Sequence, residues 1–273
     1  MERTGIGSMG FYGGGIMNGI LTVSNARVAQ MSISTLIVVL LLSGCTTVGV
    51  HDSAALRSID FGPQQVVRLC AWLDEGITEV EARELLIKAW KHDASRFELE
   101  MQIVRSRPFT RSGFFASAIA AQVIRLPLED ACDRVVVFVG RHAGDVLWGF
   151  LGLPEILGWA NDVTRTHAYA VTRFGSLQQV LFLTPSGVLR HELLHLLGCE
   201  HGWSLSACYG RIAEMKRAKR GDFFPAWDAI NQTVLASRAS VAATLADRSS
   251  GQREAHKARR VWEAGANSGG DAT

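Results

Sequence analysis

The sequence lacks a marked excess of charge of either sign. Its 28 Lys and Arg residues nearly balance 26 Asp and Glu residues, which gives a formal net charge of +2 over 273 residues. Proteins that bind nucleic acid through electrostatics carry a strong positive field, so this balance gives no support for nucleic-acid binding. With 48% hydrophobic and 20% charged residues, the composition is that of a globular protein. The length allows one sizeable domain or two halves around a cleft.

The sequence also lacks an apolar run long enough to span a bilayer comfortably. Residues 32–44 read SISTLIVVLLLSG, which is the length of a signal-peptide core. The run leads into Leu42-Ser43-Gly44-Cys45. This tetrapeptide resembles the lipobox of bacterial lipoproteins, in which the cysteine is lipidated and becomes the mature N-terminus. An uncleaved anchor or a buried helix is the alternative.

The lipobox resemblance implies a domain organisation and a location. Residues 1–45 would be a lipoprotein signal segment, and within it residues 1–30 are unusually long and Gly-rich, so the true start is expected further along, at Met17 or Met31. The protein would then be lipid-anchored in a bacterial cell envelope. Thr46, rather than Asp, follows the cysteine, which by resemblance to sorting in Gram-negative bacteria implies the outer membrane, facing the periplasm.

One short stretch has the spacing of a metal site. Residues 191–201 read HELLHLLGCEH, which is H-E-x-x-H-x-x-G-x-x-H. On a helix, His191 and His195 lie about 40° apart and one turn from each other, so both imidazoles can face one point, with Glu192 at its flank. Gly198 can adopt a left-handed conformation that ends the helix. The chain can then turn and bring His201 back to the same point.

This pattern resembles the zinc signature of the metzincin metallopeptidases. The resemblance covers 11 residues and implies His191, His195 and His201 as Zn²⁺ ligands, with Glu192 as the catalytic base. It implies an α+β fold with a mixed twisted sheet and the zinc helix in an upper subdomain, above a smaller, mainly helical lower subdomain. The implied function is that of a membrane-anchored, zinc-dependent peptidase acting on peptide or protein substrates.

One part of the metzincin pattern is not evident. Metzincins have a methionine in a tight turn beneath the zinc, and the only downstream candidate is Met215, in a stretch that reads as helix. Glu214 lies 19 residues after His195 and offers a rival, because in the similar gluzincins a downstream glutamate is the third ligand. A third possibility is a catalytically inert, zinc-binding envelope lipoprotein.

The cysteines bear on the same region. Outside the cytoplasm disulfides persist, and once Cys45 is assigned to lipid four cysteines remain, which allow three connectivities. A Cys199–Cys208 pair is favoured, since it closes a short loop that would brace the turn carrying His201. Cys70–Cys132 then follows by elimination. The alternative is that one or both pairs are buried thiols.

Hydrophobic periodicity predicts the remaining organisation. We expect a tether over residues 46–62, a metallopeptidase domain over 63–246 and a disordered tail over 247–273. In metzincins the strand shortly before the zinc helix forms the lip of the cleft, and residues 166–172 fit that strand, with a free edge that could hold a peptide. The alternative is an ordinary sheet strand that holds no substrate. Ser186 is expected to cap the zinc helix. The other expected helices cover 66–73, 78–92 with a Thr78–Glu81 capping box, 114–124, 209–220 and 226–245, and strands cover 97–103 and 134–139.

Overall fold

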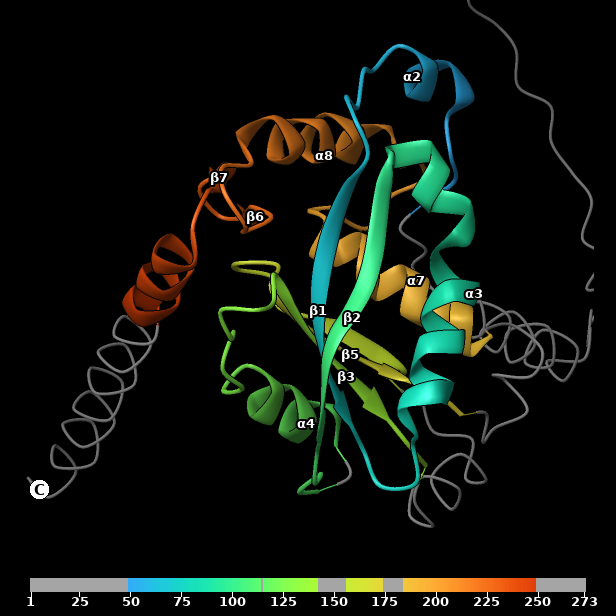
Figure 1. The fold of residues 1–273 in the computed structure, drawn as a ribbon, viewed down its shortest axis with the longest axis vertical. Coiled ribbons are helices and arrows are strands. Elements are labelled where there is room, and N and C mark those ends of the chain that lie inside the picture. Colours follow the sequence, from blue (N-terminus) through green and yellow to red (C-terminus); the bar gives the residue numbers. More distant parts are fainter. Residues whose placement is uncertain (1–48, 114, 142–155, 174–183, 249–273) are drawn as a thin grey trace, which may run out of the picture. The chain divides into compact units, whose positions relative to one another are not determined.

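A mixed sheet of five strands, four of them parallel, organises the part of the chain that the computed structural model describes (Figure 1). The described residues are 49–113, 115–141, 156–173 and 184–248, all within the unit that begins at Thr46. The predicted signal segment with Cys45 and most of the predicted tail lie outside these residues. This architecture of strands and helices is compatible with the expected α+β class.

The strand order in the sheet is β2-β1-β3-β5-β4, and only β4 runs antiparallel to its neighbour. A separate antiparallel pair, β6 and β7, follows late in the chain. The strands are β1 (Gln65–Leu73), β2 (Leu99–Pro108), β3 (Arg134–Val139), β4 (Gly158–Ala160), β5 (His167–Val171), β6 (Ala226–Asp228) and β7 (Thr233–Leu235). The helices are α2 (Ser53–Arg57), α3 (Glu79–Phe97), α4 (Ala116–Val123), α7 (Pro185–Leu196) and α8 (Ser206–Ala218), and residues 238–248 form a further helical segment.

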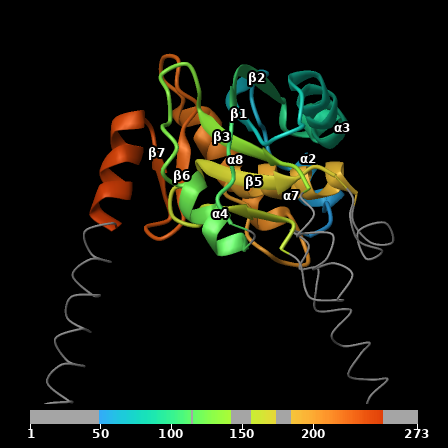
Figure 2. The ribbon, with the colours of Figure 1, turned by 90° about the horizontal axis from the view of Figure 1, so that it is seen from below.

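Helices cover both faces of the sheet, and the side chains of β3 alternate between them as strand geometry requires. Val136 and Phe138 pack in one hydrophobic cluster with α3 and with Leu193 of α7. Val137 points to the opposite face and packs with Ile119 of α4. Figure 2 shows α3 and α4 on opposite sides of the sheet. Because both faces are buried, every residue of β3 is buried, which is typical of parallel strands.

The same two-sided burial explains one wrong prediction. Residues 66–73, expected to be helical, form most of β1, between β2 and β3. A short apolar run does not distinguish a fully buried strand from a helix segment by its periodicity. Similarly, the amphipathic stretch 226–245 is not one helix but the β6–β7 hairpin followed by the segment from residue 238.

The strand expected to offer a free edge is also different from the prediction. β5, over His167–Val171, pairs with β3 on one side and β4 on the other, so neither of its edges is free. Within the described part of the chain, the open edge of the sheet at this end belongs to β4. Any peptide that adds to the sheet beside α7 must therefore pair with β4.

Two interactions fix α3 and orient α7 against it. Thr78 and Glu81 form the expected capping box at the start of α3, with Thr78 Oγ1 accepting from the Glu81 amide at 3.2 Å. Near the other end of α3, the fully buried Asp93 accepts a hydrogen bond of 2.5 Å from Nε of Arg190. Since Arg190 directly precedes His191, this ion pair sets the position of α7 along α3.

None of the helices that the structure describes is long and apolar enough to cross a membrane.

Candidate metal centre

The N-terminus of α7 and its packing in the core follow from its sequence. Thr184, not Ser186 as expected, is the N-cap, and its hydroxyl accepts a hydrogen bond of 3.0 Å from the Gly187 amide. Pro185 occupies the first turn, where its missing N–H costs nothing. Buried leucines then hold the helix in the hydrophobic core: Leu189, Leu193, Leu194 and Leu196. The cap and these buried contacts therefore position α7 without any contribution from its histidines.

The end of α7 is a Schellman motif built on Gly198. The Cys199 amide donates to the Leu194 carbonyl at 3.0 Å, and the Gly198 amide donates to the His195 carbonyl at 2.9 Å. Gly198 has φ +80° and lies against Trp227, whose Cγ would be 3.1 Å from a Cβ at this position. Both the backbone conformation and the close packing require glycine. The predicted left-handed turn is thus present, and it redirects the chain towards His201.

The segment after the turn is held from several directions. Cys199 is disulfide-bonded to Cys208 of α8, and Cys70 is bonded to Cys132, so the favoured connectivity is present. Arg211 donates to the Gly198 carbonyl at 2.8 Å. On the far side of His201, the Val50 amide donates to the Trp203 carbonyl at 3.1 Å and the Leu205 amide to the Val50 carbonyl at 3.0 Å. The loop carrying His201 is therefore braced along its whole length.

These constraints bring three ring nitrogens together. Nε2 of His195 lies 3.0 Å from Nε2 of His191 and 3.2 Å from Nε2 of His201, and the His191–His201 separation is also 3.2 Å. A metal held tetrahedrally at about 2.0–2.1 Å from each nitrogen sets them about 3.3–3.4 Å apart. The three histidines could therefore hold a metal ion.

The protonation states suit metal binding. Nδ1 of His195 must donate to the Cys199 carbonyl, 2.6 Å away, because that oxygen can only accept. The neutral ring therefore carries its lone pair on Nε2, which faces the other two histidines. Burial lowers the pKa of His191 to about 4 and that of His195 to about 3, and it also lowers the pKa of His201. His191 and His195 are accordingly neutral at pH 7, and burial favours the neutral form of His201 as well.

Glu192 supplies a buried carboxyl group beside this centre. It is 4% exposed, and within the described residues its Oε2 has no hydrogen-bond partner. Burial raises its pKa to about 8, against the opposing effect of the positive charge of Arg165. Gly158 of β4 packs directly on it, since a Cβ there would lie 2.3 Å from Glu192 Oε1. An orphaned buried oxygen of this kind calls for a partner, and none of the described residues provides one.

Two residues named in the sequence analysis do not join the group. Glu214 is exposed on α8 and is not in the histidine cluster, so the third position belongs to His201. Met215 lies in the interior of α8, fully buried in the hydrophobic core, and so does not form a turn. Gly158, Arg165 and Trp227, which do contact or influence the site, were not anticipated, because no local pattern marks them.

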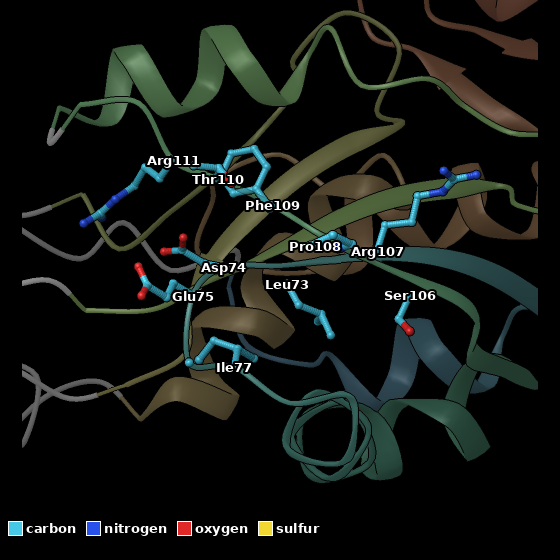
Figure 3. A pocket seen from close by; sticks show the side chains of 11 residues that line it. Leu73, Asp74, Glu75, Ile77, Ser106, Arg107, Pro108, Phe109, Thr110 and Arg111 are labelled. Atoms are coloured by element: carbon cyan, nitrogen blue, oxygen red, sulfur yellow. The ribbon is translucent and has the colours of Figure 1, made fainter.

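The described part of the chain also contains a cavity of about 590 Å³ away from the histidines, at the carboxyl ends of β1 and β2. Figure 3 shows Asp74, Glu75 and Arg111 at one end of it and Ser106 and Arg107 at the other. None of the three histidines or Glu192 lines it. The candidate metal ligands, on α7 and in the loop after it, are therefore outside this cavity.

A scan against protein-family models and a search of the curated proteins find no match. The assignment of a metal site therefore depends on the geometry of His191, His195 and His201 in this chain.

The geometry predicts which third ligand matters for metal affinity. His201→Ala should weaken Zn²⁺ binding by more than about 100-fold, since losing even an outer-shell partner of a ligand costs about 10–100-fold. Glu214→Ala should leave the affinity within about twofold of the wild type. Competition with a chromophoric chelator measures both affinities. The reverse order of effects would show that the site is built on Glu214.

The contact between β4 and Glu192 predicts a second effect. Gly158→Ala places a methyl group where Glu192 Oε1 now lies, so the carboxylate must shift while the three histidines stay in place. We expect metal stoichiometry to be unchanged. If Glu192 is the base that the metzincin resemblance implies, hydrolytic activity should fall by about 100-fold, because displacement of a reacting group by about 1 Å has effects of this size. Full activity of Gly158→Ala would mean that Glu192 does not act at this position.

Proposed function

We propose that the chain is a zinc-dependent peptidase in which His191, His195 and His201 hold Zn²⁺ and Glu192 is the general base. One observation carries this proposal: the Nε2 atoms of three histidines lie within 3.2 Å of one another beside a buried carboxyl oxygen that has no partner among the described residues. The motif's resemblance to the metzincin signature supports the same reading.

The donor set favours zinc. Imidazole nitrogens suit Zn²⁺, and a set of three histidines leaves the fourth tetrahedral position for water or substrate, as catalytic zinc sites require. The burial of the three rings also fits an open position. His195 is buried, His191 is half-buried and His201 is exposed, so the group faces solvent on the His201 side.

The roles of the chain's own residues follow from their placement. Zinc supplies Lewis acidity, which lowers the pKa of water and polarises a carbonyl group. A nearby dication favours the ionised form of Glu192 over the neutral form that burial alone favours. The Glu192 carboxylate then accepts a proton from the attacking water and passes it to the leaving amine. Its burial excludes bulk water, which would otherwise compete for the same oxygen.

The sheet edge beside Glu192 suits an extended peptide. The Val171 amide donates to the Leu157 carbonyl and the Asn161 amide to the His167 carbonyl, each at 2.7 Å. Because main-chain groups alternate along an antiparallel pair, those of Gly158 and Ala160 point to the open side of β4. A peptide that added a strand there would lie directly beside Glu192.

We further propose that the protein is anchored by lipid at Cys45 in a bacterial cell envelope and that its outer-membrane location follows from Thr46. The motif at Cys45 supports this, and so do the two disulfides of the folded domain, which are stable in an oxidising compartment such as the periplasm. The substrate would then be a peptide or protein of the same compartment.

The decisive experiment removes the general base. Glu192→Gln should retain one Zn²⁺ per chain, while peptide hydrolysis falls by about 10²- to 10⁴-fold, the usual contribution of a positioned base. The matched control is Glu84→Gln, an exposed carboxyl group on α3, which should remain fully active. Equal inactivity of the wild type and Glu192→Gln, over broad peptide libraries, would instead indicate an inert zinc protein.

The anchoring proposal has its own test. In a bacterial host, the wild type should incorporate an alkyne-tagged palmitate and partition into membranes, whereas Cys45→Ser should do neither, because the lipidated thiol is absent. Labelling that is equal in the two proteins would rule out Cys45 as the modified residue.

A further inference from the structure

Arg165 occupies an unusual position in the turn between β4 and β5. It has φ +52°, in the left-handed region that side chains other than glycine rarely adopt. The turn around it is firmly held: Asn161 Oδ1 accepts from the Val163 amide at 2.7 Å, and the Asn161 carbonyl accepts from the Arg165 amide at 3.2 Å. Backbone strain of this kind persists only where the surroundings impose it, and it clusters at functional sites.

The side chain of Arg165 is buried, and none of the described residues pairs with it. It is 9% exposed, and among the described residues its guanidinium has no hydrogen-bond or ion-pair partner. Nε is fully buried without a partner, whereas the terminal nitrogens keep contact with solvent. Buried guanidinium groups are normally matched to a carboxylate or to carbonyl oxygens. The fully buried Arg134, which donates to the carbonyls of Leu196, Phe224 and Pro225, shows the usual solution in the same protein.

Arg165 is close enough to the three histidines and Glu192 for its positive charge to act on this group. Burial has the largest effect on the pKa values there, and the charge of Arg165 opposes the rise at Glu192 and adds to the fall at His195 and His201. Two other carboxylates, Asp162 and Glu200, are near enough to influence Arg165, but Glu200 is paired with Arg211 at 2.9 Å, and neither forms an ion pair with Arg165 among the described residues. With a divalent cation on the histidines, one guanidinium and one Glu192 carboxylate, the site carries a net positive charge that favours an anionic ligand.

We propose that Arg165 is a specificity-determining residue that binds a carboxylate of the peptide substrate next to the scissile bond. The guanidinium fork matches a carboxylate in two parallel charge-assisted hydrogen bonds. The carboxylate belongs either to an acidic side chain or to a free C-terminus. This inference rests on the proposed peptidase function and narrows its substrate class to acidic or C-terminal peptide segments.

The first test is a binding measurement that requires no hydrolysis. The zinc-loaded wild type is titrated with two hydroxamates of equal length, succinic acid monohydroxamate, which ends in a carboxylate, and succinamide monohydroxamate, which ends in an amide. We expect the carboxylate probe to bind at least tenfold more tightly. Equal affinities for the two probes, or no binding of either to the zinc-loaded protein, would overturn the proposal.

Variants separate a role in binding from a role in stability. Arg165→Gly removes the left-handed strain and the unpaired buried charge, so its melting temperature should equal or exceed that of the wild type, while the preference for the carboxylate probe disappears. Arg165→Lys keeps the charge but not the fork and should retain only part of the preference. Arg83→Gln, on α3, is the matched control and should bind both probes as the wild type does. A destabilised Arg165→Gly that keeps the preference would assign Arg165 a structural role.

Two sets of peptide substrates then show whether the carboxylate comes from a side chain or from a free C-terminus. One set carries Glu or Gln at each position flanking the scissile bond, with an amidated C-terminus, and the other set is neutral with a free or amidated C-terminus. In each protein, cleavage of a carboxylate-bearing peptide is compared with cleavage of its own neutral partner, and Arg165→Gly should remove this advantage for one of the two sets. If no peptide is hydrolysed while the probes are still discriminated, the peptidase function fails and the carboxylate site stands. If hydrolysis occurs with no carboxylate preference in either set, the carboxylate site fails alone.

Discussion

Three neutral imidazole nitrogens held within 3.2 Å of one another are the constraint on which the rest of this structure depends. A cation bound by the three nitrogens would accept their lone pairs and make this close approach favourable. Contacts elsewhere in the protein hold the three rings in this arrangement. Buried leucines pack α7 into the hydrophobic core, and Asp93 forms an ion pair with Arg190, one residue before His191. A Schellman motif fixes the C-terminus of the helix. Two ligands are thus set by secondary structure, and the third is set by tertiary packing.

The tertiary part of the site comes from segments that are far apart in the sequence. Trp227, between α8 and β7, packs under Gly198, while Gly158 on the edge strand supports Glu192. The buried Arg134 of β3 donates to the Leu196 carbonyl at the end of α7 and to carbonyls just before β6. Burial lowers the pKa of this guanidinium only to about 10, so it stays charged and continues to bind these carbonyls. The metal centre therefore lies where the sheet, the helix end and the late hairpin meet.

Local patterns were enough to predict the features that local chemistry determines. The spacing of His191, His195 and His201, the turn at Gly198, the capping box at Thr78 and the buried strand over residues 134–139 all follow from short stretches. The errors arose where burial on two sides hides the periodicity, as in β1, or where sheet order decides which edge is open, as for β5 and β4. Arg165 and Gly158 acquire their roles only through distant neighbours, so nothing adjacent to them in the sequence marks them.

The short parallel pairing between residue 50 and residues 203–205 has a mechanical consequence. These main-chain hydrogen bonds begin only two residues beyond His201, and Gly49 lies within a few ångströms of the Gly202 and Ser204 backbone. Force applied along the chain from its N-terminal side would load this loop before it reached the sheet. Tension at that end of the molecule would therefore act first on the loop that carries His201, and only afterwards on the hydrophobic core.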